Sequence, residues 1–143
     1  MGSTGKAQKP AAGALAKLAH RNREIQDAVM EAGGVPPLLS LLNVQVPDVQ
    51  VHAAAAVAEL CRDNPTVQTV VSKAGGIGPL LALLSSRSAA AQAHGMSALA
   101  RLASRNPENQ DAIAKQVRHP PREPASRRVW HGHAAVVSTF RVC

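Results

Sequence analysis

Aromatic residues are almost absent from this sequence. It has no tyrosine, one tryptophan and one phenylalanine, and the last two, Trp130 and Phe140, lie close to the C-terminus. A core built from the first 117 residues therefore has to pack through leucine, valine, isoleucine and alanine. No apolar run approaches the roughly 20 residues that a membrane-spanning helix needs, and the N-terminus lacks the apolar segment of a secretion signal.

Cysteine is also scarce. Cys61 and Cys143 show none of the paired spacings of zinc or redox sites, and two cysteines cannot build the disulfide framework of a small secreted domain. Together with the lack of a secretion signal, this predicts a soluble intracellular protein. The cytoplasm is the expected compartment, and the sequence does not exclude the nucleus.

Positive charge is in excess, but it is unevenly distributed. The 143 residues include 16 Lys and Arg against 9 Asp and Glu, a net charge of +7, of which residues 1–117 contribute +3 and residues 118–143 contribute +4. The excess is therefore mainly a property of a C-terminal tail, which could bind nucleic acid or another anionic surface. The residues that would serve this alternative function are Arg118, Arg122, Arg127, Arg128 and Trp130.

The chain repeats itself with a period of 42 residues. A period in the low forties with helical patterning is typical of solenoids built from two-helix or three-helix units. The spacing relates three sets of identical residues, which are Leu18, Leu60 and Leu102, then Asn22, Asn64 and Asn106, and finally Gln26, Gln68 and Gln110.

Each unit is predicted to contain a short helix, a glycine break, a second short helix, a loop and a long helix. Asn22 is placed to cap the first helix, and Gly33-Gly34 can end it because glycine tolerates positive φ. Pro36 stands in the first turn of the second helix, where proline is tolerated. The long helix is expected over residues 48–61. The next cycle repeats these features at Asn64, Gly75-Gly76, Pro79 and residues 88–103.

The amino-acid sequence of the units resembles that of the armadillo repeat family. The matching segments are Asn106–Ala114, NPENQDAIA, and Lys73–Leu84, KAGGIGPLLALL. The resemblance covers residues 11 to about 115 and is nearest to the vacuolar, plant and protist members that act as adaptors. It implies an all-α, right-handed superhelical solenoid of three-helix repeats, apparently a fragment with two complete repeats and two partial ones.

The family resemblance also implies a function without catalysis. Armadillo proteins are scaffolds whose third helices line a concave groove that binds an extended peptide or a partner protein, and no cofactor is expected. The expected groove residues are Lys17, Glu59 and Arg101, with Gly13, Ala55 and Ser97 one turn earlier. Nuclear-import members carry Asn and Trp in these two rows, so their localisation peptides are not the expected ligand. A row of mixed sign favours a peptide that carries both charges.

The expected domain boundaries follow the period. Residues 1–10 are predicted to be a disordered lead, and residues 11–116 to hold the repeats. The repeats divide into a partial unit 11–21, complete units 22–63 and 64–105, and a partial unit 106–116. Because terminal repeats usually need polar caps, the uncapped ends predict marginal stability or self-association.

The remaining residues, 117–143, are predicted to be a disordered basic tail. After Lys115 the sequence no longer has the glycine break of the repeat, and Pro120-Pro121 disfavour a helix at this point. We interpret this tail as sequence read past an exon boundary or in another frame, with a genuine basic arm as the alternative.

The sequence also contains residues that could form a metal site or a catalytic site, but it does not support either. His52 and His94 share a repeat position and could hold a metal, but no cysteine or carboxylate recurs beside them to complete a set of about four ligands. An enzyme would need catalytic groups that converge in a pocket, whereas Asp27, Asp63 and Asp111 recur or lie at helix boundaries, where capping explains them. Neither a metal site nor a catalytic site is therefore expected.

Overall fold

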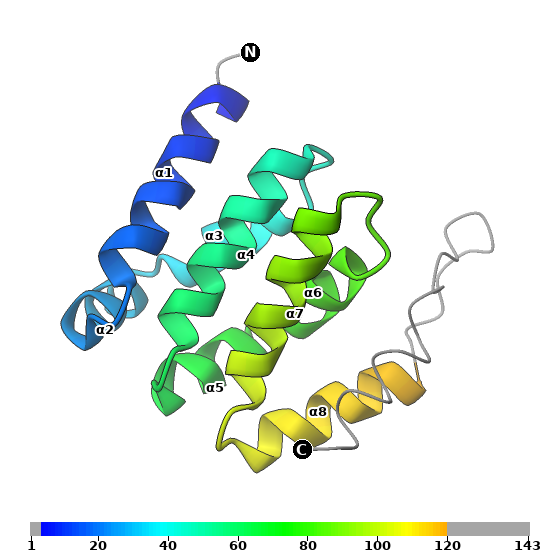
Figure 1. The fold of residues 1–143 in the computed structure, drawn as a ribbon. Helices are drawn as coiled ribbons and strands as arrows, with labels where there is room; N and C mark the ends of the chain where they lie inside the picture. Colours follow the sequence, from blue (N-terminus) through cyan, green and yellow to red (C-terminus); the bar gives the residue numbers. More distant parts are fainter. Residues whose placement is uncertain (1–3, 120–143) are drawn as a thin grey trace.

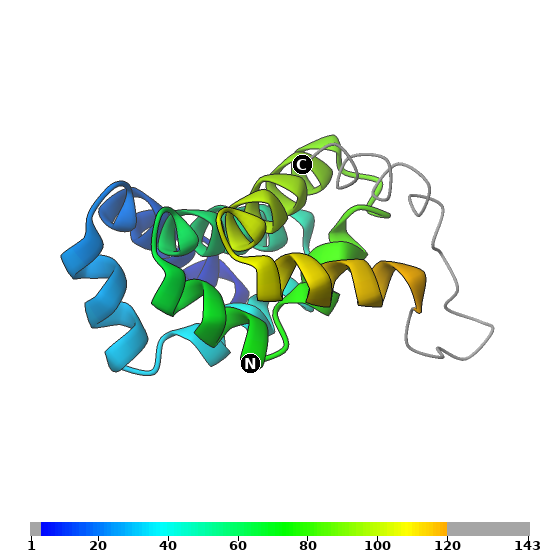
Figure 2. The ribbon, with the colours of Figure 1, turned by 90° about the horizontal axis from the view of Figure 1, so that it is seen from below.

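The computed structural model of the chain describes residues 4–119, and every regular element within them is an α-helix. The long helices α1, α4 and α7 lie side by side in one layer, and the short helices α2, α5 and α8 form a second row behind them (Figures 1 and 2). The helices are α1 (Thr4–Ala19), α2 (Arg23–Glu31), α3 (Val35–Leu42), α4 (Pro47–Cys61), α5 (Pro65–Lys73), α6 (Ile77–Leu83), α7 (Ala89–Ala103) and α8 (Pro107–Arg118).

The predicted caps and glycine breaks are confirmed. The Asn22 side chain accepts a hydrogen bond from the Ile25 amide at 3.1 Å, and Asn64 and Asn106 do the same at α5 and α8. At the end of α2, Gly33 has φ +73° and the Gly34 amide donates to the Val29 carbonyl at 2.9 Å. These are the left-handed residue and the long bond of a Schellman motif, and Gly75 with Gly76 repeats them after α5.

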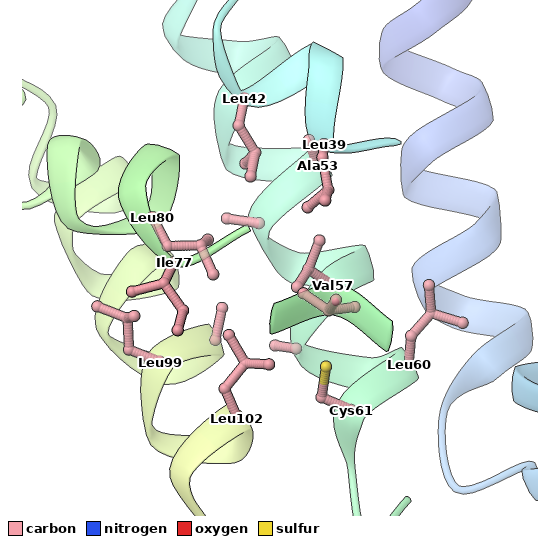
Figure 3. Packing of buried hydrophobic residues seen from close by; sticks show 14 of the residues in the cluster. Leu39, Leu42, Ala53, Val57, Leu60, Cys61, Ile77, Leu80, Leu99 and Leu102 are labelled. Atoms are coloured by element: carbon pink, nitrogen blue, oxygen red, sulfur yellow. The ribbon is translucent and has the colours of Figure 1, made fainter. Parts of the chain in front are cut away.

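The core is aliphatic, as the composition requires. Figure 3 shows Leu60 directed towards α1, and Leu102 and Cys61 packed between α4 and α7. Ile77 and Leu80 of α6 pack in the same cluster, so each short helix closes the core beneath a pair of long helices. The buried residues form one continuous cluster that runs from α1 to α8, so each unit is buried mainly by its neighbours.

A ladder of amide side chains joins successive units. Asn64, whose exposed fraction is 0%, donates from Nδ2 to Gln26 Oε1 at 3.1 Å and to Asp27 Oδ1 at 2.9 Å. One unit later, Asn106 Nδ2 donates to Gln68 Oε1 at 3.2 Å. The 42-residue recurrence of Asn and Gln therefore reflects a cap that also binds the preceding unit.

The first helix begins earlier than the sequence predicts. Residues 1–10 were expected to be disordered, but α1 begins at Thr4 and contains Pro10. An interior proline costs a helix about 3 kcal/mol. Packing of α1 along α4 offsets this cost, and Lys9 Nζ lies 2.8 Å from Asp48 Oδ2 across the two helices.

The last helix ends later than predicted. The tail was expected to begin at residue 117, but α8 continues to Arg118, and Val117 is buried in the core. The helix continues because Gln116 and Val117 stand where Ala74 and Gly75 end α5, so no glycine is present to take positive φ. The rest of the predicted tail lies outside the described residues.

Candidate functional site

The two predicted rows lie along the three long helices. Residues four apart share a face of a helix, so each long helix contributes one residue to each row. Lys17 is exposed, whereas Glu59 and Arg101 are half-buried. In the row one turn earlier, Gly13, Ala55 and Ser97 are all half-buried. We call this surface, made by Lys17, Glu59, Arg101, Gly13, Ala55 and Ser97, the long-helix face.

Glu59 is the centre of an ion-pair cluster on this face. Arg62 Nη2 and Nε each donate to a Glu59 carboxylate oxygen at 2.9 Å. His20 Nδ1 of the α1–α2 connection lies 2.9 Å from Glu59 Oε2, and Arg101 Nη2 of α7 lies 4.0 Å from Oε1. The cluster therefore links three consecutive units around one carboxylate.

This arrangement shifts the ionisation of its members. The hydrogen bond from Arg62 is the largest influence and lowers the pKa of Glu59 below its usual value, with further contributions from His20 and Arg101. The same hydrogen bond raises the pKa of Arg62. Glu59 is therefore ionised at neutral pH, and its charge is already compensated by Arg62.

Arg101 is held less completely than Arg62. Its Nε atom is buried and has no hydrogen-bond partner among the described residues, and its side chain is 28% exposed. Its Nη2 atom lies 4.0 Å from Glu59 Oε1, which is a long distance for an ion pair. The buried Nε is out of reach of a ligand, so a ligand carboxylate could use only donors in the exposed part of the Arg101 side chain.

A shallow groove lies between α1 and α4 at the other end of the face. Its volume is about 560 Å³, and its lining includes Lys9, Gly13, Lys17 and His52. Gly13 is needed for this close approach, because a Cβ atom there would lie 2.9 Å from His52 Cδ2. His52 Nδ1 is 2.6 Å from the Asp48 carbonyl oxygen, which fixes the ring against its own helix.

Sequence reasoning missed two members of the cluster, His20 and Arg62. They are themselves 42 residues apart, with Ser104 as the third member of their row. The period could therefore have placed them beside the row of Lys17, Glu59 and Arg101. Only the structure shows that both of them contact Glu59.

The other predicted sites fall largely outside this surface. Arg118 is exposed at the end of α8, whereas Arg122, Arg127, Arg128 and Trp130 lie outside the described residues. Within residues 4–119, no group of three or more His, Cys, Asp or Glu residues is placed to hold a metal ion. None of the helices in this range is long and apolar enough to cross a membrane.

Several solved structures that resemble this chain are armadillo repeat proteins. The sequence profile of the armadillo/beta-catenin-like repeat matches residues 22–62. A computationally designed armadillo repeat protein for modular peptide recognition is 26% identical over 96% of this chain and 60% of its own, with a TM-score of 0.78. A designed armadillo repeat protein in complex with the peptide (KR)4 is 25% identical over 92% of this chain and 57% of its own, with a TM-score of 0.72.

A natural relative shares the fold at lower identity. The armadillo repeats only protein from Plasmodium falciparum is 19% identical, with a TM-score of 0.65, over 92% of this chain and 60% of its own. The chain thus spans less than two thirds of the length of these structures. No curated protein sequence matches it. The predicted fold, an all-α armadillo-type solenoid, is confirmed.

Proposed function

Because this chain is an armadillo repeat protein, we propose that it is a non-enzymatic scaffold whose long-helix face binds an extended peptide or a segment of a partner protein. The single observation that carries this proposal is the continuous face across α1, α4 and α7 (Figure 1), with the charged residues Lys17, Glu59 and Arg101 at a constant repeat position. The peptide complex of a designed relative supports the same use of the fold.

The charges of the face favour carboxylates in the ligand. Lys17 and Arg101 lie on either side of Glu59 in the row, and the Glu59 charge is neutralised by two hydrogen bonds from Arg62. The sequence-based expectation was a ligand of mixed charge, because Glu59 would repel carboxylates. We propose instead that acidic groups contact Lys17 and Arg101, since Glu59 is not available to attract a cation.

The described residues support a binding role better than a catalytic one. Cys61 is the cysteine that lies within the described residues. Burial raises the pKa of its thiol to about 12, so it is not a nucleophile at neutral pH. The ion pairs of the long-helix face lie on an open surface and not in a closed pocket, where catalytic groups would be sheltered from water.

The test measures peptide binding by the full chain with fluorescence anisotropy. The probes are three labelled octapeptides of equal length, which are (KR)4, an alternating Lys-Glu peptide and an alternating Asp-Glu peptide. The acidic peptide should bind most tightly and (KR)4 least. Lys17→Glu should weaken acidic-peptide binding roughly 3-fold to 10-fold, because it replaces one exposed ion pair by a repulsion.

The matched control is Lys73→Glu, which makes the same charge change on α5, outside the long-helix face. Equal losses in Lys17→Glu and Lys73→Glu would show a nonspecific charge effect and contradict the proposed site. If the full chain binds a single-stranded oligonucleotide and a chain ending after residue 119 does not, the basic tail is the functional segment.

A further inference from the structure

The N-terminal long helix exposes a face that its counterparts bury. Leu18 of α1 is 63% exposed, whereas Leu60 and Leu102 at the same repeat position are 0% exposed. Figure 3 shows Leu60 directed towards α1, the preceding long helix. The exposed face, which we call the leading face, consists of Ala11, Ala14 and Leu18, whose counterparts are Ala53, Ala56 and Leu60 on α4 and Gly95, Ala98 and Leu102 on α7.

The other end of the array exposes the complementary face. On α4, Ala54 and Ala58 are buried. The matching residues of α1 are Ala12, which is buried, and Ala16, which is half-buried against the core. Their counterparts on α7 are Met96, which is half-buried, and Ala100, which is exposed. We call Met96 and Ala100 the trailing face. One chain therefore carries both halves of a contact that it forms internally twice, between α1 and α4 and between α4 and α7.

The amide ladder ends in the same complementary way. Asn64 donates to Gln26 and Asp27, and these two acceptors recur as Gln110 and Asp111 on α8. At the opposite end, Asn22 repeats Asn64 but is exposed. Asn22 and the Gln110-Asp111 pair are thus the donor and the acceptors of one further rung, and they lie at opposite ends of the molecule.

We propose that a second copy of this chain docks head to tail, with the leading face of one copy against the trailing face of the next. In this arrangement α8 of one copy and α1 of the next belong to one composite unit, and Asn22 donates to Gln110 and Asp111 across the contact. The two faces and the rung require the same relative placement, since all three follow the 42-residue register of the internal interfaces.

Several features make a second copy the occupant that fits this face. The contact continues an interface that is present twice in the structure, and both the apolar and the polar halves are supplied by the chain itself. Within residues 4–119 nothing supplies the composite unit with a helix equivalent to α3 or α6, so the contact made by these residues should be weaker than the internal ones. Because the two faces differ, each copy keeps one free face after pairing. The contact also repeats the internal step of a superhelical solenoid, which does not return to its start, so it should produce open-ended oligomers and not rings.

Sedimentation velocity of the full chain over a range of concentrations tests the proposal. The wild-type chain should show a weight-average mass that rises with concentration beyond that of a dimer. Leu18→Arg and Ala100→Arg should each remain monomeric, with at least a 10-fold loss of association. An equal mixture of the two should form a heterodimer and nothing larger, because only one intact face of each variant remains.

The control is Val46→Arg at the start of α4, which replaces a large apolar side chain that is 45% exposed and lies outside both faces. It should associate like the wild-type chain. Circular dichroism should show that all variants keep their helicity, since all three sites are exposed. A wild-type chain that is monomeric at every concentration would overturn the proposal, even if another molecule or segment covers the leading face. Dimers of Ala100→Arg alone, or a mixture without heterodimer, would overturn the head-to-tail arrangement.

Discussion

The Asn64→Ala variant separates the two roles that the ladder assigns to this asparagine. The substitution removes the side chain that caps α5, which costs about 1 kcal/mol in typical helices. It also removes the Nδ2 donor from Gln26 Oε1, at a site where Gln26 and Asn64 are both buried. A buried acceptor left without a partner costs about 1–3 kcal/mol. The expected loss of unfolding free energy is therefore about 2–4 kcal/mol.

Asn22→Ala is the matched control, because it removes the same kind of cap from α2 without removing a bond between units. Asn22 Oδ1 accepts from Ile25 as Asn64 Oδ1 accepts from Val67, but Asn22 is exposed. Its loss should cost only about 1 kcal/mol. The difference between the two variants, about 1–3 kcal/mol, measures the contribution of the rung that joins two units.

Urea denaturation followed by circular dichroism measures both variants. With a slope of about 1–3 kcal/mol per molar urea, the expected difference corresponds to a midpoint shift of roughly 0.3–3 M. Protein concentrations low enough to keep the chain monomeric prevent contacts between copies from stabilising Asn22. Equal losses for the two variants, or a loss below about 1 kcal/mol for Asn64→Ala, would refute the assignment of a stabilising rung.

Three further predictions concern a charge, two glycines and the end of α8. Hydrogen bonding lowers the folded-state pKa of Glu59, so its ion pairs should stabilise the protein above the unfolded pKa of 4.5 and lose this effect as pH falls through the lower folded pKa. Glu59→Gln should therefore reduce stability at pH 7. Denaturation at successively lower pH should show the difference between variant and wild type shrinking. Gly95→Val should destabilise the protein by about 1–3 kcal/mol, since a Cβ atom there would lie 3.0 Å from Leu83 Cβ. Gly78→Ala should stabilise α6 by about 0.5–1 kcal/mol, because a Cβ atom there meets only ordinary contacts. Melting temperatures that rise in both variants would contradict the packing argument. Ending the chain after residue 116 should cost about 1.5–3 kcal/mol relative to ending it after residue 119, because Val117 is buried, and equal melting temperatures would show that this burial contributes nothing.

Much of the fold could be predicted from the sequence because its signals are local. The caps at Asn22 and Asn64 act over three residues, and the glycine breaks act within one turn. The boundaries that differ from prediction depend on distant contacts. Pro10 is tolerated in α1 where α4 supports the helix, and Val117 extends α8 where the core accepts its side chain.

The candidate site could be predicted only in outline. The period placed Lys17, Glu59 and Arg101 in one row, and the helical spacing placed all three on one face. Arg62 is three residues from Glu59, so helical spacing alone allows this pair. The period did not show that His20 and Arg101 also approach Glu59, since these contacts depend on how adjacent units are rotated and how far apart they lie. The sequence therefore suggested a row of alternating charge, whereas the structure contains a compensated carboxylate between cations.

The sequence by itself determined the repeat length, the order of helices in each unit and the residues that begin and end them, because these follow from hydrophobic spacing and from hydrogen bonds within a few residues. The tertiary structure decided what each repeated residue does. Leu18 and Leu60 are the same residue at the same position, yet one is 63% exposed and the other is fully buried. The physical reason is that a residue in a solenoid gains its burial and its partners from the neighbouring unit, and the sequence of one unit does not state whether that neighbour is present.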